Sequence, residues 1–163
     1  MTVLIRQADP ADADLIAELV RDLAEYEKLA HEAKATSDDV RAALFCDAPR
    51  AHALIAELDG APVGFALYFL NFSTFLGRHG IYLEDLFVRP TARGSGAGKA
   101  LLRALAKIAV TRGFGRVEWS VLDWNEPAIG FYQWIGAVPM DGWTVYRLAG
   151  EALQAFGAED AAE

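Results

Sequence analysis

Cysteine is almost missing from this sequence, since Cys46 is the only one among 163 residues. An intrachain disulfide is therefore impossible, and chains without disulfides are typical of a reducing compartment, so we expect a cytoplasmic protein. Histidine is also scarce, and the three histidines are scattered, with no cluster of His and Cys at metal-ligand spacing. We therefore expect no metal site.

Long apolar runs and basic residues are in short supply as well. No stretch approaches the ~20 apolar residues that a membrane-spanning helix needs, and the N-terminus has no signal-peptide pattern, so we expect no membrane association. Lys and Arg number 15 against 23 Asp and Glu, which gives a formal net charge of −8. This balance disfavours nucleic acid as a partner, because phosphates need basic surfaces, and it is compatible with a cationic substrate.

What the sequence does contain is ample material for a core, since 53% of its residues are hydrophobic. Apolar alternation and β-branched residues predict strands at 2–6, 51–58, 61–72, 81–88, 116–122 and 143–148. Helical periodicity and capping residues predict helices at 10–29, 37–45, 100–112 and 126–136, and a loop is expected at 71–80. This order predicts an α/β fold with one mixed sheet covered by helices on both faces. We expect one domain over 1–157 and a frayed acidic end over 158–163.

The stretch from Ile81 to Gly113 is the most informative, because a strand, a glycine-dense loop and a helix follow one another there. The N-terminus of a helix offers unpaired N–H groups and a positive dipole end, and glycines let an anion approach them. A phosphate cradle is one interpretation, and a tight strand-to-helix connection without a ligand is the other. A mononucleotide P-loop is excluded because Ala100 stands where Ser or Thr would bind magnesium. The dinucleotide fingerprint also fails, because Lys99 stands where its third glycine would fall.

A third pattern, Arg/Gln-x-x-Gly-x-Gly/Ala, is satisfied by Arg93, Gly96 and Gly98. It resembles the pyrophosphate-binding loop of the GCN5-related N-acetyltransferases (GNAT), which bind acetyl-CoA. The motifs Tyr82-Leu83-Glu84-Asp85 and Trp124-Asn125-Glu126-Pro127 resemble the spermidine/spermine (diamine) acetyltransferases and their thialysine-acetylating relatives. The resemblance covers nearly the whole chain and implies the GNAT-like acyl-CoA N-acyltransferase fold, with acetyl-CoA as co-substrate and a homodimer.

The resemblance also implies roles for individual residues. Tyr132 is expected to be the general acid that protonates the departing thiolate. From the chemistry of the residues themselves, Glu84 is expected to be the base through water, with Asp85 as second candidate. The residues expected to contact the cofactor are Leu86, Phe87, Val88, Arg93, Gly94, Ser95, Gly96, Ala97, Gly98, Lys99, Asn125, Glu126, Pro127, Ala128 and Tyr132. The residues expected to line the amine site are Tyr26, Glu27, Glu84, Glu118, Trp119, Ser120 and Asp141.

Two positions depart from the family pattern. Leu86 stands where an aromatic residue is usual, and Asp141 stands where Glu is usual, which leaves the identity of the amine open. The leading hypothesis is an acetyl-CoA-dependent N-acetyltransferase in which a primary amine of a polyamine, diamine or lysine analogue attacks the thioester directly. The alternatives are acetylation of a protein or peptide amine and a non-catalytic acyl-CoA-binding module.

Overall fold

The computed structural model describes residues 1–158 and divides the chain into two compact units, Met1–Leu122 and a second that begins at Asp123. The first unit contains a five-stranded sheet in the order β1-β2-β3-β4-β5. Strands β1 to β4 pair in antiparallel fashion, whereas β5 is parallel to β4. The predicted mixed sheet is thus confirmed; its strands are β1 (Val3–Gln7), β2 (His52–Leu58), β3 (Ala61–Ser73), β4 (Arg78–Val88) and β5 (Val117–Glu118).

Two hairpins build most of this sheet. The β2–β3 turn uses Asp59 and Gly60 with φ of 51° and 86°, the pair of positive values that a two-residue turn between twisted strands requires. The β3–β4 hairpin is longer than expected, because Ser73 still pairs with Arg78 inside the predicted loop. The predicted extent of the loop at 71–80 was therefore wrong, and only 74–77 connect the strands.

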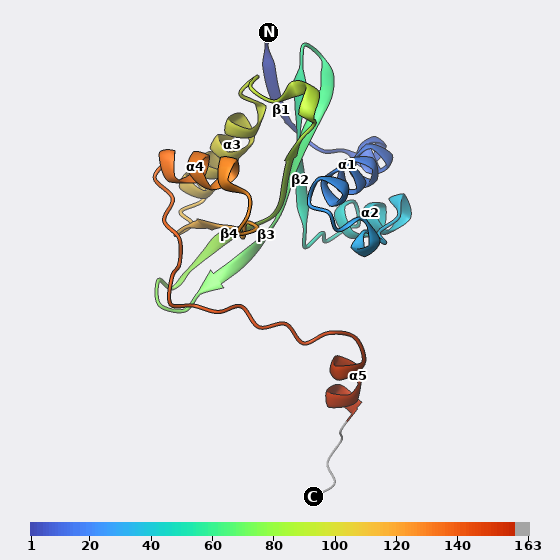
Figure 1. Cartoon of the computed structure of the whole chain (residues 1–163), viewed down its shortest axis with the longest axis vertical. Helices are drawn as coiled ribbons and strands as arrows, with labels where there is room; N and C mark the ends of the chain where they lie inside the picture. Colours follow the sequence, from blue (N-terminus) through green and yellow to red (C-terminus); the bar gives the residue numbers. More distant parts are fainter. Residues whose placement is uncertain (159–163) are drawn as a thin grey trace, which may run out of the picture. The chain divides into compact units, whose positions relative to one another are not determined.

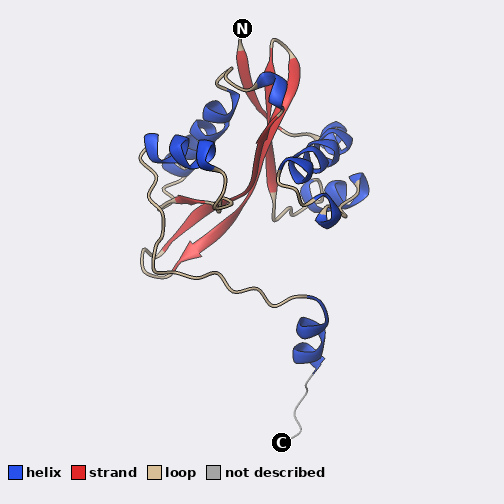
Figure 2. Ribbon diagram, in the orientation of Figure 1, coloured by secondary structure: helices blue, strands red, loops and turns tan. Residues whose placement is uncertain are grey.

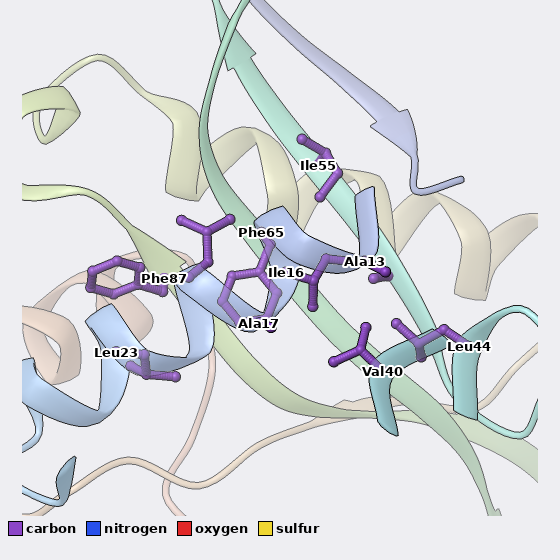
Figure 3. Close-up of a cluster of buried hydrophobic side chains, with 11 residues drawn as sticks. Ala13, Ile16, Ala17, Leu23, Val40, Leu44, Ile55, Phe65 and Phe87 are labelled. Atoms are coloured by element: carbon purple, nitrogen blue, oxygen red, sulfur yellow. The ribbon is translucent and has the colours of Figure 1, made fainter. Parts of the chain in front are cut away.

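Helices cover both faces of the sheet, with α1 (Ala13–Tyr26) and α2 (Ser37–Leu44) on one face and α3 (Ala97–Thr111) on the other (Figures 1 and 2). Short 3-10 turns, η1 (Pro10–Asp12), η2 (Ala30–Glu32) and η3 (Pro90–Ala92), join these elements. The core beneath α1 is formed by Ile16 of the helix and by Phe65 and Phe87 of β3 and β4, all 4% exposed or less (Figure 3). This packing fixes α1 against the middle strands β3 and β4.

The second unit contains α4 (Glu126–Trp134) and α5 (Gly150–Ala158). The predicted strand at 143–148 was wrong, because these residues have no regular structure and Trp143 and Tyr146 are 78% and 93% exposed. A strand requires a hydrogen-bonded neighbour, and none of the sheet strands within 1–158 pairs with this segment. The predicted frayed end lies outside the described residues except for Ala158, which ends α5.

Candidate active site

A β-bulge in β4 decides where the acidic residues of the Tyr82–Asp85 motif lie. Asp85 pairs with Leu67 and Leu83 pairs with the next residue, Tyr68, so Glu84 is an extra residue without a cross-strand partner. Paired residues share a face of the sheet, and Leu67 packs against the core beneath α1. The bulge therefore places Asp85 on the α1 face, half-buried, whereas Glu84 is exposed to solvent.

Asp85 is the most perturbed acid of the first unit. Burial, together with the negative charges of Glu84 and Glu27, raises the pKa of its carboxyl group to about 6, and burial is the largest of these causes. Glu27 follows the last residue of α1, and burial raises its pKa as well. Two carboxyl groups that lie in a partly desolvated region can hold a cation, and one with a pKa near neutrality is suited to proton transfer.

Arg93 joins the start of the glycine loop to the end of α1. Its guanidinium carbon lies 4.4 Å from the centroid of the Tyr26 ring, and its Nε donates a hydrogen bond to the carbonyl of Val88 at 3.3 Å. The Tyr26 ring in turn lies 6.4 Å from the ring of Phe87. Arg93 was predicted to bind the cofactor; in the structure its side chain holds the loop close to the residues Tyr26 and Glu27.

The glycine loop has the conformation of an anion cradle. Gly94 and Gly96 have φ of 82° and 88°, which β-carbon-bearing residues rarely adopt, and Gly96 is the residue that precedes α3. Within residues 1–158, the N–H groups of Gly96 and Gly98 have no hydrogen-bond partner, while the N–H of Ala97 donates to the Ser95 hydroxyl at 3.3 Å. Unpaired N–H groups at the positive end of a long helix suit a phosphate group.

The edge of β4 is open next to this cradle. Strand β5 pairs with β4 only at Ile81 and Tyr82, so within residues 1–158 no strand pairs with the remaining residues Leu83–Val88 on that side. The side chain of Phe87 is 4% exposed and belongs to the core, so this residue can contact a ligand only through its backbone. An exposed strand edge can pair with an extended ligand that carries amide groups.

The predicted residue Glu118 is held by neighbours within the first unit. Its carboxylate forms an ion pair with Arg116 at 2.7 Å and accepts a hydrogen bond from the Asn71 amide at 3.3 Å. Asn71 was not predicted, because its position in a supposed loop hid its pairing with the sheet. Glu118 therefore has less unpaired negative charge to offer a cation than Glu27 or Asp85.

A second unpredicted contact involves Tyr82, whose hydroxyl lies 3.0 Å from the hydroxyl of the predicted residue Ser120. The Tyr82 ring packs against Phe69 with centroids 5.2 Å apart. The hydrogen bond between Tyr82 and Ser120 therefore connects β4 to the chain just after β5 ends at Glu118. Trp119, also predicted for the amine site, is half-buried.

The predicted residues of the second unit are Asn125, Glu126, Pro127, Ala128, Tyr132 and Asp141. The Asn125 side chain caps α4 by accepting a hydrogen bond from the N–H of Ala128 at 3.4 Å, as the sequence predicted. Tyr132 lies in α4 with its ring 5.8 Å from that of Phe131. Asp141 lies in the exposed, irregular segment between α4 and α5.

No helix within residues 1–158 is long and apolar enough to cross a membrane. Over the same residues, no group of three His, Cys, Asp or Glu side chains could hold a metal ion.

The chain is similar in sequence and in structure to known proteins. Residues 16–137 match the model of the Acetyltransferase (GNAT) family. The chain is 39% identical to the thialysine N-epsilon-acetyltransferase of Bos taurus, over 93% of this chain and 95% of that protein. It is 34% identical to an L-ornithine N5-acetyltransferase of Arabidopsis thaliana, over 93% and 86%. An integron cassette protein from the mobile metagenome of V. cholerae has a TM-score of 0.80 and 29% identity, over 97% and 99%.

Proposed function

This chain belongs to the GNAT family and is an N-acetyltransferase, and we propose that it acetylates a primary amine of a small cationic substrate, such as a diamine, a polyamine or a lysine analogue. The observation that carries this proposal is the pair of partly buried carboxyl groups, Asp85 and Glu27, next to the Arg93 end of the glycine loop. Related enzymes named for thialysine N-epsilon and L-ornithine N5 acetylation support a side-chain amine as acceptor.

Members of this family use acetyl-CoA, and the residues present fit that co-substrate. The backbone N–H groups of 94–99 would hold its pyrophosphate, since Gly94 and Gly96 have the left-handed conformation that leaves the approach open. The open backbone of Leu86–Val88 would pair with its pantetheine arm, and the start of α4, Asn125–Ala128, would contribute further contacts. Acetyl-CoA supplies an activated acetyl group as a thioester.

The acceptor amine must lose a proton, because a primary amine has a pKa near ~10.4 by analogy with lysine. We expected Glu84 to receive this proton through water, but it is exposed, whereas Asp85 is half-buried and has a pKa of about 6. Asp85 therefore replaces Glu84 as the proposed base, and Glu27 attracts the cationic end of the substrate. The amine nitrogen then forms a bond to the acyl carbon while the carbon–sulfur bond breaks.

The departing thiolate needs a proton, and Tyr132 is the proposed donor. A phenol with a pKa of ~10 stays protonated at neutral pH and can protonate a thiolate whose own pKa is ~8.5 by analogy with cysteine. We predict that Tyr132→Phe lowers kcat more than ~10-fold with little change in acetyl-CoA affinity. Stopped-flow thiol release and calorimetric binding of CoA measure the two effects separately, and unchanged turnover would remove Tyr132 from the mechanism.

A substrate screen tests the proposed function. Thiol release from acetyl-CoA should be followed with diamines, polyamines, lysine analogues, amino acids and peptides as acceptors. Turnover with one of the small diamines, polyamines or lysine analogues supports the proposal. Turnover with peptides alone would favour a protein acetyltransferase, and CoA binding without transfer to any amine would favour a non-catalytic module.

We also propose that the protein is cytoplasmic, as its single cysteine suggested, and that it is a homodimer, as the resemblance of its sequence implied. The dimer is supported by the second unit, where Trp143, Val145 and Tyr146 are 78%, 86% and 93% exposed. Clusters of large apolar side chains on a surface favour association with another protein surface, here a second copy. Light scattering on the purified protein distinguishes a dimer from the 17.7 kDa monomer.

A further inference from the structure

A groove runs along α3 on the side of the first unit that carries β1 and β2, and no residue of the proposed acetyl transfer lines it. It consists of two adjoining cavities of about 440 and 380 Å³, which share Gln7, Lys107 and Ile108. The helix contributes successive turns of one face to the wall: Ala100, Arg103, Ala104, Lys107, Ile108 and Thr111. The opposite wall comes from β1, β2 and β3.

The charge of this groove is opposite to that of the chain. Its lining residues include no Asp or Glu, although the chain has a net charge of −8. Arg6 is neutralised by ion pairs with Asp12 and Glu57, at 2.7 and 2.6 Å. The other lining cations, Arg103, Lys107 and Arg112, form no ion pair with any of the described residues 1–158.

The floor of the groove is apolar and aromatic. Tyr68 is 4% exposed and Leu54 is 3% exposed, and the ring of His52 lies 5.5 Å from that of Tyr68. Burial and the positive charge of Arg112 both lower the pKa of His52, so its neutral ring adds an N–H donor without repelling the cations at neutral pH. Cationic groups above an apolar floor match a ligand with an anionic head and an apolar body.

We propose that this groove binds a small amphipathic organic anion, whose carboxylate or phosphate head contacts Lys107 and Arg112 and whose apolar body lies over Ile108 and Leu54. Cationic side chains bind such heads through charge-assisted hydrogen bonds, and burial of the apolar body adds to the affinity. The site is separate from the acetyl-CoA cradle, because none of its lining residues belongs to the loop 93–99.

Two-dimensional NMR titration of the full chain tests this proposal with octanoate, octyl phosphate, inorganic phosphate and octylamine as probes. We expect octanoate or octyl phosphate to shift the backbone signals of 52–54, 68 and 107–112, with saturable binding that CoA does not displace. Octylamine should leave these signals unchanged, and inorganic phosphate should bind more weakly than octyl phosphate. The relative affinities of the two octyl probes identify the preferred head group.

Charge-reversal variants locate the site. Lys107→Glu combined with Arg112→Glu should weaken binding of the octyl anions at least about tenfold, since both proposed head-group contacts become repulsive. Arg21→Glu combined with Lys34→Glu changes the net charge equally at exposed positions outside the groove and should leave the affinity unchanged. No saturable shift at millimolar probe, displacement by CoA, equal binding of octylamine, or equal losses in the two double variants would each overturn the proposal.

Discussion

Replacing Asp85 by Asn should stabilise the protein above pH 6. The pKa of Asp85 is about 6 in the folded chain and near its ordinary value of 3.8 in the unfolded chain, mainly because burial disfavours the charged carboxylate. Between these values the folded state binds more protons than the unfolded state, so the free energy of unfolding falls as the pH rises. The folded and unfolded pKa values differ by about 2 units, which corresponds to a loss of about 3 kcal/mol in the free energy of unfolding. This loss is fully present above pH 6.

Asn cannot ionise, so Asp85→Asn removes this cost. The side-chain amide of the new Asn must still be desolvated on folding, which offsets part of the gain. We therefore expect the free energy of unfolding to rise by about 1–3 kcal/mol at pH 7. The gain should shrink as the pH falls from 6 and become small near pH 4, where Asp85 is protonated in the folded state and about half protonated in the unfolded state. For a chain of this length, 1 kcal/mol corresponds to roughly 2–4 °C in the melting temperature.

Urea unfolding at pH 4, 5, 6 and 7, followed by circular dichroism, measures the effect. Glu84→Gln is the matched control, because it removes the same charge from the neighbouring, exposed position and should change stability by less than about 0.5 kcal/mol. The same Asp85→Asn protein should lose about 10²- to 10⁴-fold in kcat/KM with the amine if Asp85 is the base. A stability difference that is absent at pH 7, or that does not depend on pH, would refute the burial of an ionised Asp85.

Substitutions at three glycines test the packing of the fold and the anion cradle. In the urea assay, Gly64→Ala should lower the free energy of unfolding by about 2 kcal/mol, because the new Cβ would lie 2.5 Å from the carbonyl oxygen of Phe87. Gly130→Ala is the contrasting variant: its new Cβ lies in open space within α4, so it should raise the free energy of unfolding by about 0.5–1 kcal/mol. Gly96→Ala should weaken calorimetric CoA binding severalfold, because a β-carbon at φ of 88° costs about 1–2 kcal/mol and shifts the first turn of α3. Unchanged CoA affinity in this variant would contradict the cradle.

The sequence predicted the order of elements in the first unit well, because each element carries its own local information. Asp59-Gly60 encodes a two-residue turn, and the apolar stripe of α1 encodes a helix. The strand at 143–148 was predicted from the same kind of pattern, but a strand also needs a partner, and the segment itself does not encode one.

The candidate site was predictable to the level of motifs but not of individual carboxylates. Alternation along β4 places Glu84 and Asp85 on opposite faces, yet the bulge that turns Asp85 toward α1 depends on how β3 and β4 pair. The proximity of Glu27 to Asp85 and of Arg93 to Tyr26 likewise depends on how α1 packs against the sheet, which no local pattern encodes. The choice between Glu84 and Asp85 as the proposed base therefore required the folded structure.

The pH dependence of kcat/KM for the amine tests the proposed site most directly. If Asp85 must be ionised to accept the amine proton, the acid limb of the wild-type profile should have its midpoint near pH 6, and it should disappear in Asp85→Asn together with most of the activity. Acetyl-CoA binding should be unaffected by the same substitution. An acid limb near pH 4, or a fully active Asp85→Asn protein, would contradict Asp85 as the base.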